Sequence, residues 1–258
     1  MLFPISDDDR ALTGRAWVTL VLLAINLAVY FGLQTTDAFT YGYSVIPQEI
    51  TTGTDLVGSA SVPVTDPATG EVGSVEIPQA PGPVPIYLTI LTAMFMHGGL
   101  AHLGGNLLYL WIFGDNVEHR FGSGVFLLFY LASGVAATVA QIALEPSSVV
   151  PSLGASGAIS GVLGAYLVLF PKNRVNAVFF FRVVSVPAVV VLGLWIAFQF
   201  VNGYGAIART EQTTGGVAYG AHIGGFVAGV VLAFALRSRG LHERASVVSP
   251  DAPVGAWR

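Results

Sequence analysis

Long apolar runs separated by short polar stretches dominate the pattern of this 258-residue chain. About 20 consecutive apolar residues are needed for a helix to cross a hydrocarbon core roughly 30 Å thick. The segments that qualify are residues 16–33, 86–113, 124–144, 153–171, 183–201 and 218–237. The pattern therefore predicts an all-α polytopic membrane protein with one six-helix domain over residues 16–237. A short segment, residues 1–15, precedes it, and a polar tail, residues 238–258, follows it.

The connection between the first two spans, residues 34–85, is long and rich in Pro, Gly, Thr and acidic residues. Its Thr/Val alternation around residues 60–77 favours a short hairpin. The apolar segment 83–96 runs directly into His97-Gly98-Gly99, so we expect a helix or interfacial segment that breaks at the glycines. We expect the whole connection to be an ordered extracellular insertion with a mobile part.

Composition supports a membrane protein and narrows its chemistry. Hydrophobic residues make up 53% of the chain and charged residues only 10%, whereas soluble domains are about 25% charged. The chain contains no cysteine, which excludes disulfides, thiolate catalysis and thiolate metal sites. Any catalytic chemistry must therefore use hydroxyl, imidazole or carboxylate groups.

The Lys and Arg residues predict the orientation, because short cytoplasmic loops collect them. If there are six spans, ten of the eleven fall on one side: Arg10, Arg15, Arg120, Lys172, Arg174, Arg182, Arg237, Arg239, Arg244 and Arg258. The other side holds residues 34–85, the loop near Pro146, and residues 202–217 with Arg209. Both termini are therefore predicted to be cytoplasmic.

Two further features bear on the class of protein. Asp7, Asp8 and Asp9 precede the first span, which has no small-residue cleavage site, so we expect a retained helix and not a signal peptide. The formal net charge of −4 and the lack of a basic stripe argue against a nucleic-acid partner. The lipid bilayer and membrane-inserted proteins are the expected partners.

Ser156 and His222 are the candidate nucleophile and base. Ser156 opens an apolar helix, and His222 lies inside another apolar run, Ala218 to Leu236. Polar groups inside a membrane are costly and indicate function, and a serine hydroxyl needs an adjacent base to become nucleophilic. Because spans four to six contain no Asp or Glu, a serine–histidine dyad is the simplest arrangement.

His102 and Asn106 are candidate donors to an oxyanion. They are four residues apart and share one helix face, and the backbone N–H of Ser156 is a third candidate, with Gly154 as backbone support. The alternative is that Asn106 caps or bonds a neighbouring helix while the histidines sit at the interfacial end. In combination with Ser156 and His222, the catalytic interpretation is favoured.

Small residues mark the faces on which spans four and six are predicted to touch. Gly157 and Gly161 form a small-xxx-small pair, and Gly225 and Gly229 follow His222 on one face. The alternative is ordinary glycine packing, with Ser156 bonding back to its own helix. Because Ser156 follows the extracellular loop at 146–152, we expect a polar cavity open to that side. The Gly-rich residues 202–217 would allow a movable cap over it, with a simple connecting loop as the alternative.

These residues give the chain a resemblance to the rhomboid intramembrane serine proteases, over about residues 16–237. The resemblance rests on three motifs in the right order on the right spans. They are His97-Gly98-Gly99-Leu100-Ala101-His102-Leu103-Gly104-Gly105-Asn106, Gly154-Ala155-Ser156-Gly157 and Ala221-His222-Ile223-Gly224-Gly225. Together the three are highly specific, whereas G-x-S-G alone would be weak.

The resemblance implies a six-helix fold in which Ser156 is the nucleophile and His222 the general base. It places His102 and Asn106 in the oxyanion hole and gives His97 a part in holding the first loop. Glu118 and Arg120 match a family segment that is structural. Family members cleave single-span membrane proteins near their extracytoplasmic end and need no cofactor or metal. The compact six-span form suggests a prokaryotic plasma membrane.

The chain departs from the family pattern at two places. Some relatives carry a tyrosine four residues after the nucleophile that stacks on the histidine, and here that position is Ser160. We therefore expect the imidazole to be oriented by another group. The Trp-Arg pair that some relatives have in the first loop is absent from residues 34–85.

Three alternatives to a protease are less well supported by the sequence. A catalytically inactive relative that binds membrane clients usually loses the serine or histidine, and this chain keeps both. A small transporter would be expected to show an inverted repeat, which the sequence lacks. A metal site would need a ligand pair at short helical spacing, which His97, His102, His119 and His222 do not provide.

Overall fold

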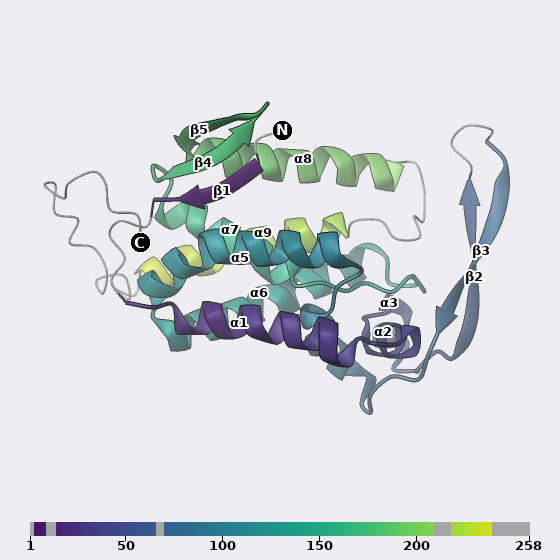
Figure 1. Cartoon of the computed structure of the whole chain (residues 1–258). Coiled ribbons are helices and arrows are strands. Elements are labelled where there is room, and N and C mark those ends of the chain that lie inside the picture. Colours follow the sequence, from purple (N-terminus) through teal and green to yellow (C-terminus); the bar gives the residue numbers. More distant parts are fainter. Residues whose placement is uncertain (1–2, 9–13, 66–69, 209–217, 239–258) are drawn as a thin grey trace, which may run out of the picture.

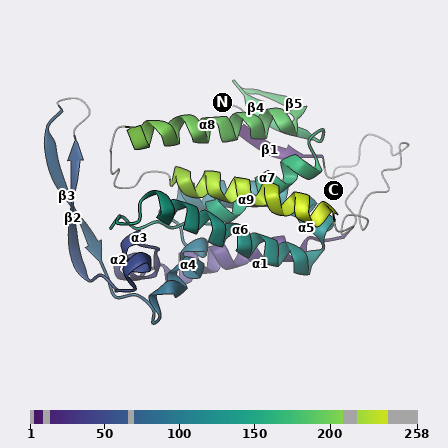
Figure 2. The ribbon, with the colours of Figure 1, turned by 180° about the vertical axis from the view of Figure 1, so that it is seen from behind.

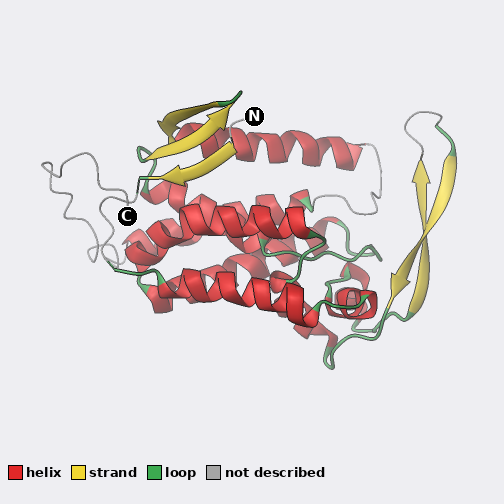
Figure 3. Ribbon diagram, viewed as in Figure 1, coloured by secondary structure: helices red, strands yellow, loops and turns green. Residues whose placement is uncertain are grey.

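A computed structural model describes residues 3–8, 14–65, 70–208 and 218–238. Helices form a bundle that carries a hairpin at one end and a small sheet near the other (Figure 1). The bundle helices are α1 (Trp17–Ala28, continued by a π-helical turn at Val29–Leu33), α5 (Leu100–Phe121), α6 (Ser123–Leu144), α7 (Ser156–Leu169), α8 (Ala188–Ala208) and α9 (Tyr219–Ser238). The expected all-α fold holds in its coarser form: the protein is mostly helical, and five strands among the described residues accompany the helices (Figure 3).

Within the described residues, two helices are long and apolar enough to cross a membrane, namely α6 and residues Tyr219–Arg237 of α9. A third span results if the segments Ile86–Phe95 and Leu100–Phe121 are counted as one, although they are bent by 76°. The remaining apolar helices, Trp17–Leu33, Ser156–Leu169 and Ala188–Gly203, are shorter.

The second predicted span, 86–113, differs from the structure in shape and length. Short helical turns (η2 Ile86–Leu88, α4 Thr89–Thr92 and η3 Ala93–Phe95) precede the break, and α5 continues beyond residue 113 to Phe121. The break falls at Gly98 and Gly99, with Gly99 as the N-cap of α5. The expected glycine break is thus confirmed.

The fifth predicted span, 183–201, begins too early. Residues Arg182–Pro187 form strand β5, and α8 starts at Ala188 and continues to Ala208. Valine-rich stretches favour strands, and a short apolar run cannot be assigned to helix or strand from hydrophobicity alone. Residues 202–208 of the expected glycine-rich cap are helical, and residues 209–217 lie outside the described residues. The predicted polar tail, from residue 239, also lies outside them.

A three-stranded antiparallel sheet joins the start of the chain to the connection between α7 and α8. Strand β4 (Arg174–Phe179) lies between β1 (Phe3–Asp7) and β5 (Arg182–Pro187). The side chain of Asn116 on α5 donates to Asp7 over 2.7 Å, and Tyr166 on α7 also donates to Asp7. The first strand is therefore tied to the ends of two bundle helices.

Glu118 fastens α1 to α5. Its carboxylate accepts hydrogen bonds from the backbone N–H groups of Val18 and Thr19 at 2.9 and 2.7 Å, and from the Thr19 and Ser123 hydroxyls. The first N–H groups of a helix lack intrahelical partners, and a carboxylate there also interacts favourably with the helix dipole. Buried Glu118 therefore acts as the cap of α1, in accord with the structural role implied by the resemblance.

Helix α7 is the centre of the bundle, where the views from both sides place it among α5, α6 and α9 (Figure 2). Every residue from Gly157 to Tyr166 is buried. A methyl group on Gly225 would overlap the carbonyl of Gly157, and one on Gly229 would overlap the carbonyl of Gly161. The predicted contact between the two glycine faces is confirmed, and it brings the α7 and α9 backbones into direct contact.

The insertion at 34–85 is ordered where the structure describes it. It contains α2 (Asp37–Tyr43), α3 (Pro47–Thr52) and the predicted hairpin, formed by β2 (Gly58–Thr65) and β3 (Val72–Gln79). The backbones of Val45 and Ser152 exchange two hydrogen bonds of 2.9 and 2.7 Å. The insertion therefore docks onto the loop that leads to Ser156. The expected mobile part is not located, since residues 66–69 lie outside the described residues.

Glu49 makes the stability of this insertion depend on pH. The side chain is 2% exposed and accepts a hydrogen bond from the Leu56 N–H at 2.8 Å. Burial, together with the nearby Asp55 carboxylate, raises the pKa of Glu49 from 4.5 to about 7. The folded insertion thus keeps a proton that the unfolded chain releases, so stability falls as pH rises from about 4.5 to about 7.

We expect Glu49→Gln to flatten this pH dependence, because glutamine cannot ionise. The measurement is the thermal unfolding midpoint in detergent between pH 4 and 8, with exposed Glu76→Gln as the matched control. An unchanged slope in Glu49→Gln would contradict the assignment.

Candidate active site

Ser156 is held at the first turn of α7 by an unusual backbone just before it. Gly154 has φ of +136°, a conformation that side-chain-bearing residues rarely adopt, and its N–H donates to the carbonyl of Ala93 at 2.8 Å. A methyl group at Gly154 would lie only 2.8 Å from His102 Cε1 and 3.4 Å from Ser156 Oγ. Glycine is therefore required where the hydroxyl and the His102 ring approach each other.

His222, near the start of α9, faces Ser156 at the place where the glycine faces of α7 and α9 are in contact. Its Nε2 lies 2.8 Å from Ser156 Oγ, and its Nδ1 lies 2.9 Å from the side-chain oxygen of Gln199 on α8. Since an amide oxygen only accepts hydrogen bonds, Nδ1 carries the proton and Nε2 presents its lone pair to the serine hydroxyl. The arrangement selects the tautomer that a general base requires.

Gln199 and Trp195 are site residues that the sequence analysis missed. Gln199 is 7% exposed, and the Trp195 ring lies 5.9 Å from the His222 ring at an interplanar angle of 34°. A usable signal was present, because Gln199 is the one hydrogen-bonding amide in the apolar run 188–201, and polar groups inside spans are costly.

Ser160 does not take the place of the tyrosine that some relatives carry. Its hydroxyl donates to the carbonyl of Ser156 at 2.6 Å, one turn back on α7. The serine that bonds to its own helix is therefore Ser160, whereas Ser156 faces His222. Contacts from α8, through Trp195 and Gln199, flank the imidazole instead.

Two donors from α5 face the same space as Ser156. His102 Nδ1 accepts from the Gly98 N–H at 3.3 Å, which leaves the proton on Nε2, an atom that would lie 2.9 Å from a methyl group placed on Gly154. Asn106 is 8% exposed, and its amide nitrogen has no hydrogen-bond partner among the described residues. A buried donor without a partner is costly, and such a donor beside the dyad is available for a developing negative charge.

His97 is buried beside these donors and holds the start of the insertion through its backbone. Its N–H and C=O bond to the side chain of Gln34 at 3.0 and 2.7 Å, while its ring packs edge-on against His102 with centroids 5.2 Å apart. His119 lies seventeen residues beyond His102 on α5, which places the two histidines roughly 25 Å apart at 1.5 Å per residue. The structure therefore separates His119 from the site.

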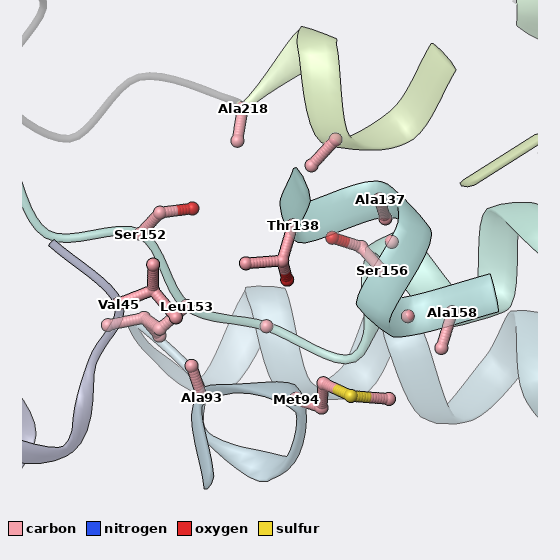
Figure 4. A pocket seen from close by; sticks show the side chains of 14 residues that line it. Val45, Ala93, Met94, Ala137, Thr138, Ser152, Leu153, Ser156, Ala158 and Ala218 are labelled. Carbon is pink, nitrogen blue, oxygen red and sulfur yellow. The ribbon is translucent and has the colours of Figure 1, made fainter. Parts of the chain in front are cut away.

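An open cavity of about 1210 Å³ connects the four candidate residues. Ser156, His222, His102 and Asn106 line it, and α8 contributes Trp195. A second cavity of about 30 Å³ lies beside Ser156, lined by Thr138 and Ser152 (Figure 4). A volume of this size is enough for a water molecule. Among the described residues, no group of three or more His, Asp and Glu side chains is placed to hold a metal ion.

Comparison with known families identifies the fold around this site. The family model described as Rhomboid domain matches residues 86–239, more than half of the chain and the whole region that carries the four candidate residues. The chain belongs to the rhomboid family. A rhomboid domain implies a polytopic membrane protein, in agreement with the apolar helices.

Rhomboid relatives from bacteria and mitochondria share about a third of the aligned residues. Rhomboid protease GluP of Bacillus subtilis is 37% identical over 147 residues, which cover 57% of this chain and 25% of the relative. Rhomboid protein 1, mitochondrial, of Saccharomyces cerevisiae is 35% identical over 148 residues, covering 56% and 40%. Putative rhomboid protease YdcA of Bacillus subtilis is 35% identical over 89 residues, covering 34% and 44%. The chain thus spans less than half the length of these relatives.

Proposed function

We propose that this rhomboid is an intramembrane serine protease that hydrolyses peptide bonds of membrane-inserted proteins. The observation that carries the proposal is the chain of contacts from Ser156 Oγ to His222 Nε2 and from His222 Nδ1 to Gln199. The relatives named as rhomboid proteases support the same reaction. The proposal includes six membrane spans, of which α1, α7 and α8 are the short ones, and cytoplasmic termini.

The proposed reaction begins when Ser156 Oγ attacks the carbonyl carbon of the scissile peptide bond. The hydroxyl proton passes to His222 Nε2, and the carbonyl oxygen becomes an oxyanion. When the C–N bond breaks, His222 gives that proton to the leaving amine, and an acyl-serine remains. Water, deprotonated by His222, then attacks the acyl carbon and releases Ser156. His222 thus acts in turn as base and acid.

His102 Nε2, the Asn106 amide and the Ser156 N–H are the proposed donors to the oxyanion. Donors already in position cost no reorganisation when charge develops, which makes such groups a major source of catalysis. The hydrogen bond from the Gly98 N–H to His102 and the buried position of Asn106 support this assignment. Gly154 supports the geometry by leaving room for the His102 ring.

The proposed substrates are transmembrane proteins, with single-span proteins as the simplest case. The cavity is lined by residues from α5 to α9 and by Pro47 of the 34–85 insertion, so it lies toward the end of the bundle that carries the insertion. Because nearly all Lys and Arg residues fall on the opposite side, that end is proposed to face the extracellular space. No cofactor or metal is required by this mechanism.

Gln199 is proposed as a positioning residue that holds the tautomer and orientation of His222. We expect Gln199→Ala to lower kcat at least roughly tenfold with little change in KM, since the orienting carboxylate of a Ser-His-Asp triad is worth about 10⁴ and a neutral amide contributes less. Gln199→Glu is expected to shift the acid limb of the pH–rate profile to higher pH, because a carboxylate stabilises the imidazolium.

Asn202, on the same helix, provides the matched control for Gln199. Its side chain donates to the carbonyl of Phe198 within α8, so Asn202→Ala should leave kcat and the pH profile unchanged. Equal effects of Gln199→Ala and Asn202→Ala would show that α8 tolerates changes poorly and would remove Gln199 from the positioning role.

Labelling with a fluorophosphonate tests the proposed function directly. We expect the detergent-purified protein to be modified at Ser156, located by peptide mass spectrometry, and to cleave a single-span reporter in liposomes. The folded protein failing in both assays would overturn the protease assignment and favour a rhomboid that binds membrane clients without cutting them.

A further inference from the structure

The hairpin between α7 and α8 exposes an aromatic tip. Phe179, Phe180 and Phe181 are 43%, 76% and 103% exposed. Val183 and Phe3, on the same sheet, are 63% and 51% exposed. Apolar side chains gathered in this way on an outer surface indicate an interaction site.

The turn itself gives no reason for two phenylalanines. Phe179 pairs with Arg182, so Phe180 and Phe181 are the central residues of a two-residue turn, with φ of +51° and +72°. Among the described residues, these two are the only ones other than glycine with positive φ. Such turns favour Asn-Gly, and bulky side chains there are strained. The aromatic rings must therefore gain their stabilisation outside the hairpin.

The surroundings of the tip match a lipid bilayer. In both views the sheet lies beside the N-terminal half of α8, and its β4–β5 tip points away from α9 (Figures 1 and 2). Val189, Val190 and Leu194, in that half of α8, are 41–59% exposed. Arg182, also exposed, pairs with Phe179 and places a positive charge next to the tip. Apolar groups flanked by cations suit the boundary between acyl chains and anionic headgroups.

We propose that the β4–β5 tip inserts Phe180 and Phe181 into the interfacial layer of the bilayer that surrounds the helices, with Arg182 at anionic headgroups. The apolar surface of the tip then continues the lipid-facing surface of α8. This anchor lies at the start of β5, and α8 follows directly from the other end of that strand, at Ala188. It is separate from the proposed catalytic residues, which lie toward the other end of the bundle.

Spin labels on single cysteines test the proposal, and the natural chain has no cysteine to remove. Phe180→Cys and Phe181→Cys are labelled in liposomes of phosphatidylcholine and phosphatidylglycerol, and their collision rates with oxygen and with a water-soluble nickel complex are compared. Leu194→Cys on α8 is the lipid-exposed control, and Val72→Cys on the β2–β3 hairpin is the aqueous control. We expect both tip labels to resemble the Leu194 label. Resemblance to the Val72 label would overturn the proposal.

A second pair of variants tests whether the phenylalanines themselves hold the tip in the membrane. Phe180→Asn with Phe181→Gly relieves the strain of the turn and should keep the hairpin folded. A label at Phe179→Cys should be shielded from nickel in the parent and become at least several-fold more accessible in the Asn-Gly variant. Unchanged shielding would overturn the role of the two rings. Shielding that disappears when the protein is diluted in lipid would identify a second copy of the chain as the occupant and likewise overturn the proposal.

Discussion

Ser156→Ala is expected to abolish cleavage of a single-span reporter while the protein remains folded and inserted. His222→Ala should have the same effect, because the two residues act as a unit through the 2.8 Å contact between Nε2 and Oγ. In soluble serine proteases, loss of either group lowers kcat by about 10⁶. The double variant should be no worse than either single variant, since removing one partner already removes the activated hydroxyl.

The measurement is reporter turnover in liposomes, together with the thermal unfolding midpoint. Ser160→Ala is the matched control, because Ser160 lies one turn further along α7 and bonds only to the carbonyl of Ser156. It should retain most of the activity. Near wild-type turnover in either Ser156→Ala or His222→Ala would remove that residue from the proposed mechanism.

Asn106→Ala is expected to lower kcat by roughly 10²–10³, the usual cost of losing one oxyanion donor. The Asn106 amide nitrogen lacks a partner among the described residues, so we expect its hydrogen bond to form only when the oxyanion appears. An interaction made only in the transition state affects kcat and kcat/KM alike and leaves KM unchanged. The same substitution also removes a buried unsatisfied donor, so it should not destabilise the fold through a lost hydrogen bond.

Kinetics of Asn106→Ala against reporters in liposomes separate the two possible roles. Unchanged kcat with a raised KM would assign Asn106 to substrate binding. A large fall in the unfolding midpoint with proportionate loss of active protein would assign it to structure. Titration of active sites with a fluorophosphonate corrects the rates for the fraction of folded protein.

Much of the site could be predicted because its residues stand out against their apolar surroundings. Ser156, His222, His102 and Asn106 are polar groups on membrane-grade segments, and the structure brings all four to one cavity. The glycines on α7 and α9 predicted which helix faces touch, since small residues permit close backbone contact. Their catalytic roles stay predictions until the variants are measured.

The errors in the fold arose where apolar character was equated with helix. Residues 183–187 are as apolar as the helix that follows, yet they pair with β4 and form a sheet edge. The spacing of hydrophobic residues and the length of a segment distinguish a helix from a strand only over longer segments. The pairing of β1 with β4 joins residues more than 160 positions apart, which no local pattern reports.

The sequence by itself determined the membrane class, the break at Gly98-Gly99, the hairpin in the insertion and the candidate residues for the chemistry. These follow from local hydropathy, turn residues and short motifs. Only the tertiary structure decided that Gln199 and Trp195 flank His222, that Glu118 caps α1, and that Asn106 is left without a partner. The physical reason is that contacts between helices depend on how each helix is rotated and how deeply it packs, and these follow from the balance of all their contacts together.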